Sequence, residues 1–328
     1  MLTTRNGIRN IDKIVENSID LKHTTFLRFT TVAVVCFVFA AKMPAADTLS
    51  VIFTGDILLD RGVRKHIEWS RDARLFSKSV DAVLRSSDVV VGNLECPATK
   101  IVSPAYKRFI FRAEPKWLGL LREYGFTHLN LANNHSIDQG RRGLMDTWQN
   151  IIAEGMVPIG AGKNMKEASQ PVCIAMKPRK VYVLASLRLP LENYAYLPDQ
   201  PCVSQEDMDS LLFRIADLKK REPDSYIIVS LHWGIEHTTT PTLQQKIEAR
   251  RIIDAGADCM ICHHTHTLQT VETYKNHTIY YSIGNFIFDQ SKPLNTRACM
   301  VKLKISKHSA QLETIPIKSG LCVKLAKE

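Results

Sequence analysis

Short apolar segments that alternate with amphipathic stretches constrain most strongly how this chain can fold. The apolar segments predict strands at Leu49–Gly55, Asp88–Gly92, His128–Ala132, Tyr226–Leu231 and Asp258–Cys262. The stretches between them predict helices at Ala73–Arg85, Pro115–Glu123, Arg141–Glu154, Gln205–Arg221 and Thr242–Ala255. Strands that are apolar on both faces are typical of sheets covered by helices. The alternation therefore predicts an α/β domain.

The pattern changes after residue 267, where helical stretches no longer separate the apolar segments. We expect strands at Gln269–Tyr274, Thr278–Ser282, Cys299–Ile305 and Gln311–Ile317. The link Tyr274–Thr278 (YKNHT) has the composition of a hairpin turn. The sequence thus predicts a single domain over residues 47–328 whose C-terminal portion, 267–317, is antiparallel.

The N-terminal region resembles a secretory signal. A short apolar run, Phe29–Ala41, follows Lys22 and Arg28 and precedes the small residues of Pro44–Ala46. A helix of this length would span only about 20 Å, less than the hydrocarbon core of a bilayer. We expect residues 1–46 to be a signal peptide, with an uncleaved anchor through 29–41 or a core helix as alternatives. As signal or anchor, the run implies export to the cell envelope, periplasmic or extracytoplasmic.

Charge and cysteine content exclude several functional classes. The 328-residue chain carries a net charge of +10, of which +7 remains over the 282 residues after position 46. No block of Lys and Arg with interleaved aromatics is present, so we expect no nucleic-acid partner. Of the eight cysteines, the seven beyond residue 46 have no regular spacing, which disfavours a disulfide scaffold. Cys259 and Cys262 fall in an apolar strand and are interpreted as small hydrophobic residues.

Polar side chains follow the five N-terminal and central strands at the point where each one ends. Singly, such residues are commonly turn formers, helix caps or hydrogen-bonded core histidines. In open α/β sheets, however, ligands bind beyond the carboxyl ends of the strands, where these residues would meet. The segments are Gly55-Asp56, Asn93-Leu94-Glu95, Asn133-Asn134-His135, His232-Trp233-Gly234-Ile235-Glu236 and His263-His264-Thr265-His266. Together they predict a metal centre.

The mixture of donor atoms narrows the choice of metal. Carboxylate and amide oxygens with imidazole nitrogens suit manganese, iron or zinc better than calcium or magnesium. No thiolate is among the candidates, which disfavours a structural zinc site. Open sites with two such ions are suited to hydrolysis of phosphate esters.

These motifs and one more resemble those of a known family. The order runs from Gly55-Asp56-Ile-Leu-Leu-Asp-Arg61 through the segments above to Tyr281-Ser282-Ile-Gly284-Asn285-Phe286. This order resembles the CapA (PgsA) capsule-synthesis family over about residues 49–290. The resemblance implies a calcineurin-like metallophosphatase-type layered sandwich, with central β-sheets flanked by helices, and an association with poly-γ-glutamate capsule formation.

The resemblance also implies roles for individual residues. His135 would be catalytic, capping a phosphoryl oxygen or protonating the leaving group. The implied ligands of one or two divalent ions are Asp56, Glu95, Asn134, His232, His264 and His266. Substrate or supporting contacts are implied for Arg61, Asn93, Glu236, His263 and Asn285. The alternatives are that Arg61 pairs with an acid at the surface and that Asn285 forms a turn.

Two departures from the family pattern bear on function. Asp56 is followed by Ile57 and Leu58, so the imidazole of the usual Asp-x-His is missing, which predicts a weaker first ion or a mononuclear site. The usual Gly-His-His-Pro-His is replaced by the segment Cys262–His266.

Three functions stay open. The first is an exported metal-dependent hydrolase of a phosphate ester in capsule, poly-γ-glutamate or other surface-polymer synthesis. The second is a non-catalytic component of a membrane-bound synthesis or export complex that grips an anionic polymer. The third is hydrolysis of an amide or other non-phosphate bond at the same centre.

Overall fold

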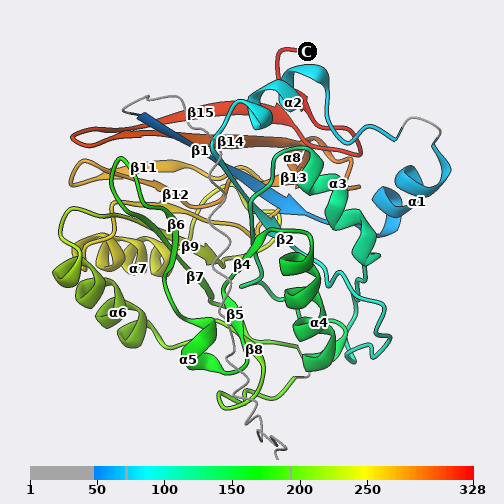
Figure 1. Cartoon of the computed structure of the whole chain (residues 1–328), viewed down its shortest axis with the longest axis horizontal. Helices are drawn as coiled ribbons and strands as arrows, with labels where there is room; N and C mark the ends of the chain where they lie inside the picture. The colour runs from blue at the N-terminus through cyan, green and yellow to red at the C-terminus, as the bar shows by residue number, and fades with distance from the viewer. Residues whose placement is uncertain (1–47, 71–72, 193) are drawn as a thin grey trace, which may run out of the picture. The chain divides into compact units, whose positions relative to one another are not determined.

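Two β-sheets lie face to face at the centre of the fold, and helices cover their outer faces (Figure 1). The computed structural model describes residues 48–70, 73–192 and 194–328. The predicted signal at 1–46, with its apolar run 29–41, lies outside the described residues. Within the described part of the chain, no helix is long and apolar enough to cross a membrane.

The first sheet has eight strands and carries both ends of the described chain. Its order is β16-β15-β14-β1-β2-β3-β4. Strand β13 lies off this path and pairs with β1 at Asp56 and Ile57, whereas β14 pairs with residues 48–53 of β1. Strands β1 to β4 are parallel, β13 is parallel to β1, and β14 to β16 are antiparallel. Their bounds are β1 Thr48–Ile57, β2 Val89–Leu94, β3 His128–Asn130, β4 Val157–Ile159, β13 Asn285–Ile287, β14 Arg297–Ser306, β15 Ala310–Lys318 and β16 Lys324–Leu325.

The second sheet has six strands in the order β11-β12-β10-β9-β7-β6. Its four inner strands are parallel to one another, and β11 and β6 are antiparallel edges. The bounds are β6 Val172–Ala175, β7 Val181–Leu187, β9 Tyr226–His232, β10 Cys259–Ile261, β11 Val271–Tyr274 and β12 His277–Tyr280. A two-stranded ribbon, β5 Ala161–Gly162 with β8 Cys202–Val203, lies apart from both sheets.

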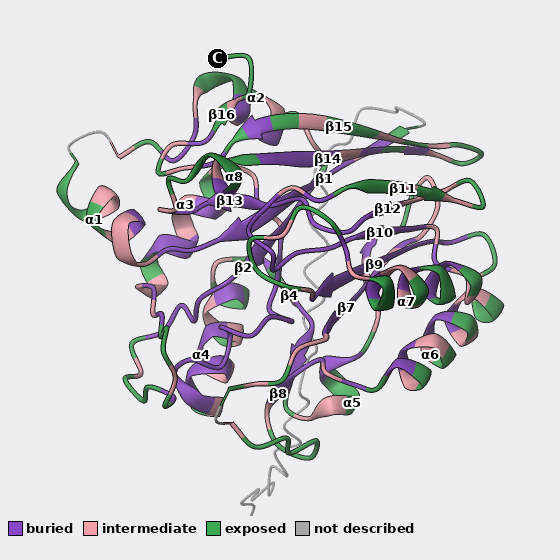
Figure 2. Cartoon of the chain, turned by 180° about the vertical axis from the view of Figure 1, so that it is seen from behind, coloured by how far each residue is buried: buried purple, intermediate pink, exposed green. Residues whose placement is uncertain are grey.

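Apolar side chains form three layers that hold the sandwich together, and the strands are buried along most of their length (Figure 2). Between the sheets, Phe53 and Val91 of the first pack in one cluster with Val183 and Ile228 of the second. The other face of the first sheet packs on α1 Arg61–Trp69, α2 Lys78–Arg85, α3 Leu118–Glu123 and α4 Gly140–Ala153. The other face of the second sheet packs on α6 Met208–Arg221 and α7 Leu243–Asp254. Shorter elements are η1 Pro115–Trp117, α5 Met165–Ala168 and α8 Pro293–Thr296.

The predicted layered α/β sandwich, with central sheets and flanking helices, is confirmed. All nine predicted strands and the hairpin between β11 and β12 are present. Each sheet is covered by helices on one face only, because its other face meets the partner sheet. The C-terminal portion is not wholly antiparallel, since β12 pairs parallel with β10 and β13 parallel with β1.

Several elements were not predicted. Helix α1 is rich in charged residues, and its start depends on Asp60, whose side chain accepts a hydrogen bond from the backbone N–H of Arg61. Strand β4 contains Pro158, which is tolerated because β4 is an edge strand. The helix expected from Ala73 begins only at Lys78, because Ser77 caps it by accepting from the N–H of Val80.

Candidate metal centre

The ends of strands from both sheets converge on one buried point. Asp56 lies at the end of β1, Glu95 directly follows β2, and His232 is the last residue of β9. His264 and His266 lie in the loop after β10. The potential ligand atoms form two groups, within each of which all atoms lie within 4.8 Å of one another: Asp56, Glu95 and His266 in one, and Glu95, His232 and His264 in the other.

Glu95 is common to both groups, which is the arrangement of a carboxylate that can serve two ions. Its side chain is fully buried, and neither of its carboxylate oxygens has a hydrogen-bond partner within the described residues. The Oδ2 atom of Asp56 is also buried without a hydrogen bond in the described structure. Unpartnered buried carboxylates are costly unless a cation neutralises them. The donor set therefore fits one or two divalent ions.

The electrostatics of the ion-free residues indicate the same need for positive charge. Burial raises the pKa of Glu95 well above its usual range, and the neighbouring charge of Asp56 raises it further. Burial opposes the charged form of His266, but Glu95 and Asp56 together raise its pKa to about 9. Here a protonated imidazole partly balances the two acids. A divalent cation would supply that charge directly.

The amide of Asn134 lies with the second group. Its Oδ1 atom is 2.9 Å from Nε2 of His232, and the same Nε2 is 3.2 Å from Nδ1 of His264. Nε2 of His232 is also 3.6 Å from Oε1 of Glu95. Two ring nitrogens that face each other at this distance cannot both donate, but both can bind a common cation. The structure thus brings all six predicted ligands together.

Neighbouring side chains hold the ligands in place. Asn93 donates from Nδ2 to Oδ1 of Asp56 at 2.8 Å, and Oδ1 of Asn285 accepts from Nδ1 of His266 at 2.9 Å. The latter bond leaves Nε2 of His266 as its ligand atom. His263 belongs to neither group; its Nε2 lies 3.2 Å from the carbonyl oxygen of Thr54. Such contacts fix the ring orientation of ligand histidines.

His135 lies in a chain of buried polar groups beside the ligands. Its Nδ1 donates to Oδ2 of Asp138 at 2.9 Å, and Oδ1 of Asp138 lies 2.6 Å from Nζ of Lys107. Lys107 also donates to the carbonyl oxygen of Asn134 at 2.9 Å. Burial lowers the pKa of His135 more than Asp138 raises it. Sequence reasoning missed both partners: the spacing of His135 and Asp138 could have indicated their contact, but nothing in the sequence singles out Lys107.

Two of the residues expected to support the site or contact substrate, Arg61 and Glu236, are partly exposed and pair with residues other than the predicted ligands. Arg61 forms an ion pair with Asp289 and keeps 37% of its side chain exposed. Glu236 is largely exposed, and one of its carboxylate oxygens is 3.8 Å from Nε2 of His237. His237 was not predicted, and its ring contacts that of His266 at 6.0 Å between centroids.

The two departures from the family pattern have distinct structural consequences. Ile57 and Leu58 directly follow Asp56, where the family pattern Asp-x-His has an imidazole. Both are fully buried in the apolar layer beneath α1 to α4. The first group consequently has one imidazole and the second has two. In the altered histidine segment, His264 has φ +99° and His266 φ +55°. Both are left-handed backbone conformations that are strained for residues other than glycine.

The described cysteines are all free. Cys259 and Cys262 are fully buried, and burial raises the pKa of the Cys262 thiol to about 12. Neither belongs to a metal-capable group in the described chain.

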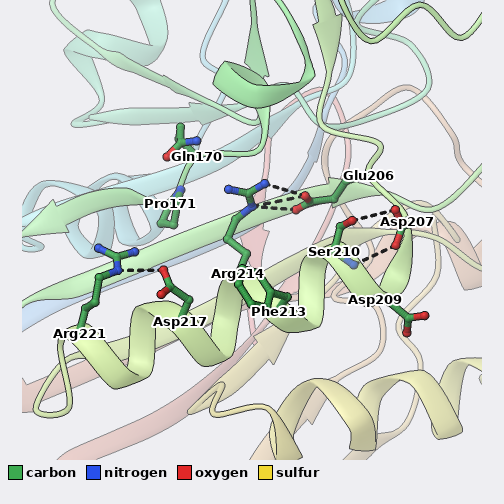
Figure 3. A pocket seen from close by; sticks show the side chains of 10 residues that line it. All are labelled: Gln170, Pro171, Glu206, Asp207, Asp209, Ser210, Phe213, Arg214, Asp217 and Arg221. Atoms are coloured by element: carbon green, nitrogen blue, oxygen red, sulfur yellow. Dashed lines mark hydrogen bonds and ion pairs between the residues drawn. The ribbon is translucent and has the colours of Figure 1, made fainter.

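A surface hollow along α6 does not compete with this site. Figure 3 shows two ion pairs among its lining side chains, Arg214 with Glu206 and Arg221 with Asp217. Asp207 accepts from Ser210, and Asp209 pairs with Arg251 outside the hollow. It contains none of the residues of the two metal-capable groups. Its polar groups are therefore satisfied without a ligand.

Comparison with known proteins identifies the family. The family model "Bacterial capsule synthesis protein PGA_cap" matches residues 50–290. The chain belongs to this family. The match extends from β1 to just beyond β13 and so includes every residue of the two metal-capable groups.

The chain is also similar in sequence to two individual capsule-synthesis proteins. The chain is 31% identical to "PGA biosynthesis protein CapA" of Bacillus subtilis (strain 168), over 84% of this chain and 73% of that protein. It is also 31% identical to "Capsule biosynthesis protein CapA" of Bacillus anthracis, over 83% and 67%. Among solved structures it is similar to NAD nucleotidase (NadN) of Haemophilus influenzae, with 11% identity, a TM-score of 0.49 and coverage of 83% of this chain and 56% of that one.

Proposed function

We propose that this protein is a metal-dependent hydrolase that acts on a phosphate ester during synthesis of capsule, poly-γ-glutamate or another anionic surface polymer. One observation carries the proposal: the carboxylate of Glu95 is buried, has no hydrogen-bond partner among the described residues and belongs to both metal-capable groups. A shared carboxylate of this kind suits a two-ion centre that stabilises the charge developing in phosphoryl transfer.

The chain's own residues have separable roles in this proposal. Divalent ions, when bound, supply the Lewis acidity that makes water nucleophilic near neutral pH. Asp138 accepts from Nδ1 of His135, so Nε2 is the ring atom that would exchange a proton with the substrate. Lys107 pairs with Asp138, the partner of His135, and also donates to the backbone carbonyl of the ligand Asn134. The same lysine therefore positions both the proton-transfer residue and a ligand.

Location and partners are part of the same proposal. The apolar run 29–41 and the names of the capsule-synthesis relatives support export to the cell envelope. The positive charge of the body supports an anionic substrate or polymer. A membrane-bound polymer synthesis complex is the proposed setting.

The test compares turnover with metal content. Full-length protein is loaded with manganese and offered phosphomonoesters and phosphodiesters, while bound metal is measured by mass spectrometry. We expect saturable hydrolysis that His135→Ala lowers by about a hundredfold or more, with bound metal unchanged. His308→Ala, which removes an exposed histidine, serves as the matched control and should retain activity. Equal activity in the His135→Ala variant would overturn the assigned role of His135.

A second candidate function is a non-catalytic metal-binding subunit that grips carboxylates of an anionic polymer. It is favoured by the buried Ile57 and Leu58, which leave the first group with a single imidazole. This function predicts metal-dependent retention of poly-γ-glutamate with no turnover of any ester. Wild-type protein that binds metal and polymer but hydrolyses neither class of ester would favour it over the hydrolase.

A further inference from the structure

The guanidinium of Arg61 lies at the border of the candidate metal centre. Its Cζ is 5.5 Å from the ring centroid of Phe111 and 5.6 Å from that of Phe288. Phe111 in turn contacts the ring of His135, with centroids 4.4 Å apart, and Phe288 contacts that of His266 at 4.9 Å. Each of the two phenyl rings therefore contacts both the guanidinium of Arg61 and a histidine of the candidate metal centre.

Asp289 fixes the orientation of this guanidinium. Arg61 donates to it from Nε at 3.1 Å and from Nη2, and these two bonds leave Nη1 for another partner. The backbone N–H of Gly62 also donates to Asp289, at 3.0 Å. A Cβ at Gly62 would lie 2.7 Å from Cβ of Asp289, so this approach requires glycine. The carboxylate and two phenyl rings together leave Arg61 little rotational freedom.

The backbone at Arg61 is strained. Its φ is +54°, a left-handed conformation that asparagine or glycine adopts at lower cost. A partly exposed ion pair contributes little stability and does not account for this strain. Strain that persists in a rigid surrounding is commonly found at ligand-binding positions.

Building on the proposed function, we propose that Arg61 is a specificity-determining residue that binds a second anionic group of the substrate, next to the reacting group at the metal centre. A guanidinium binds the oxygens of phosphate or carboxylate by charge-assisted hydrogen bonds. The substrate class is thus a molecule with at least two anionic groups.

Calorimetric titration of the full-length, manganese-loaded protein tests this assignment. The probes are pyrophosphate and a γ-linked triglutamate. We expect Arg61→Gln to weaken at least one of them by about tenfold or more, as for loss of a charge-assisted contact. Loss confined to pyrophosphate identifies a phosphate group as the ligand of Arg61, and loss confined to triglutamate identifies a carboxylate. Lys65→Gln removes the same charge from an exposed position of the same helix and should leave both affinities within about twofold.

Bound manganese and the unfolding midpoint of each variant are measured alongside. The proposal would be overturned if Arg61→Gln bound both probes as tightly as Lys65→Gln does. Arg61 would then be only the structural partner of Asp289. If Arg61→Gln fails to fold, Arg61→Lys replaces it, because lysine cannot make the two-nitrogen contact; wild-type affinity in that variant would overturn the proposal as well. Because binding is measured without turnover, absence of hydrolysis would count against the proposed function alone.

Discussion

Gly55 in β1 packs so closely on the backbone of Gly284 that no side chain fits between them. A Cβ at Gly55 would lie 1.9 Å from the carbonyl oxygen of Gly284, which accepts a hydrogen bond from the N–H of Asp56 at 3.1 Å. The approach places Asp56 beside Asn285 in the pairing of β1 with β13. Asn285 in turn orients His266. The packing of two glycines therefore determines the position of one metal-capable group.

Substitution of Gly55 tests this packing. Gly55→Ala must push β13 away from β1, so we expect the free energy of unfolding of the metal-free protein to fall by about 2 kcal/mol or more. Urea denaturation gives the value. Gly320→Ala is the control, because a Cβ there meets no atom within 4 Å. A loss no larger than that of the control would show that β13 is free to shift.

Glu95 should govern binding of both ions. Glu95→Gln keeps the shape of the side chain but removes the charge common to the two groups, so we expect it to lose both ions at a manganese concentration that saturates the wild type. Asp56→Asn, which alters one group only, should keep one of the two. Mass spectrometry after equilibrium dialysis counts the ions, with the exposed Glu313→Gln as control. Full occupancy in Glu95→Gln would rule out a shared carboxylate.

The same substitution should stabilise the metal-free protein. The oxygens of Glu95 are buried without hydrogen bonds in the described structure, and burial raises the pKa of this carboxyl well above its usual range. Folding of the metal-free protein must therefore either bury a charge or bind a proton that the unfolded chain lacks, and a neutral amide carries neither cost. We therefore expect Glu95→Gln to unfold at higher urea concentration than the wild type when chelator is present, and at lower concentration when manganese is present. A variant less stable than the wild type under both conditions would contradict this account.

Lys107 and Asp138 form a buried ion pair, with 3% and 0% of their side chains exposed. Lys107→Met leaves the carboxylate buried without its cation, and we expect a loss of about 3 kcal/mol in the free energy of unfolding. Adding Asp138→Asn to Lys107→Met should recover part of that loss, because the unpaired charge is then removed. Lys100→Met, at an exposed position in the same loop, is the control. Additive effects of the two substitutions would show that the pair is not coupled.

His128 should make the metal-free protein sensitive to acid. Burial lowers the pKa of His128 from its ordinary value near 6.5 to about 4. Between these values the unfolded chain binds a proton that the folded chain excludes, so the free energy of unfolding falls as the pH falls, by at most about 3 kcal/mol from this residue. We expect the difference between the wild type and His128→Gln to shrink or change sign from pH 7 to pH 4.

Urea denaturation in the presence of chelator at each pH measures this difference. His308→Gln, at an exposed position, should give a curve parallel to that of the wild type. A pH-independent difference between His128→Gln and the wild type would mean that His128 is protonated equally in both states.

Long periodic segments and strand-end residues were predictable from the sequence, whereas contacts between distant loops were not. Helices α6 and α7 each bury an apolar face, and the parallel strands β1, β2, β3, β9, β10 and β12 coincide with predicted apolar runs, so these elements were identified. The parallel strand β7 was missed, although its sequence is also a continuous apolar run. The ribbon strands β5 and β8 are two residues long, too short for any periodicity. Lys107 lies in an irregular loop, and only the tertiary fold brings it to Asp138.

The division of the ligands between the two sheets has a consequence for how the protein is made. Asp56, Glu95 and Asn134 lie at or after the ends of strands of the first sheet, whereas His232, His264 and His266 lie at or after the ends of strands of the second. Of the six predicted ligands, a nascent chain that has emerged only through β1 to β4 holds the oxygen donors alone. Nitrogen donors, and with them the preference for manganese, iron or zinc, come only after His232 has left the ribosome. The complete donor set, and with it the basis for selecting the metal, therefore exists only once His266 has also been made.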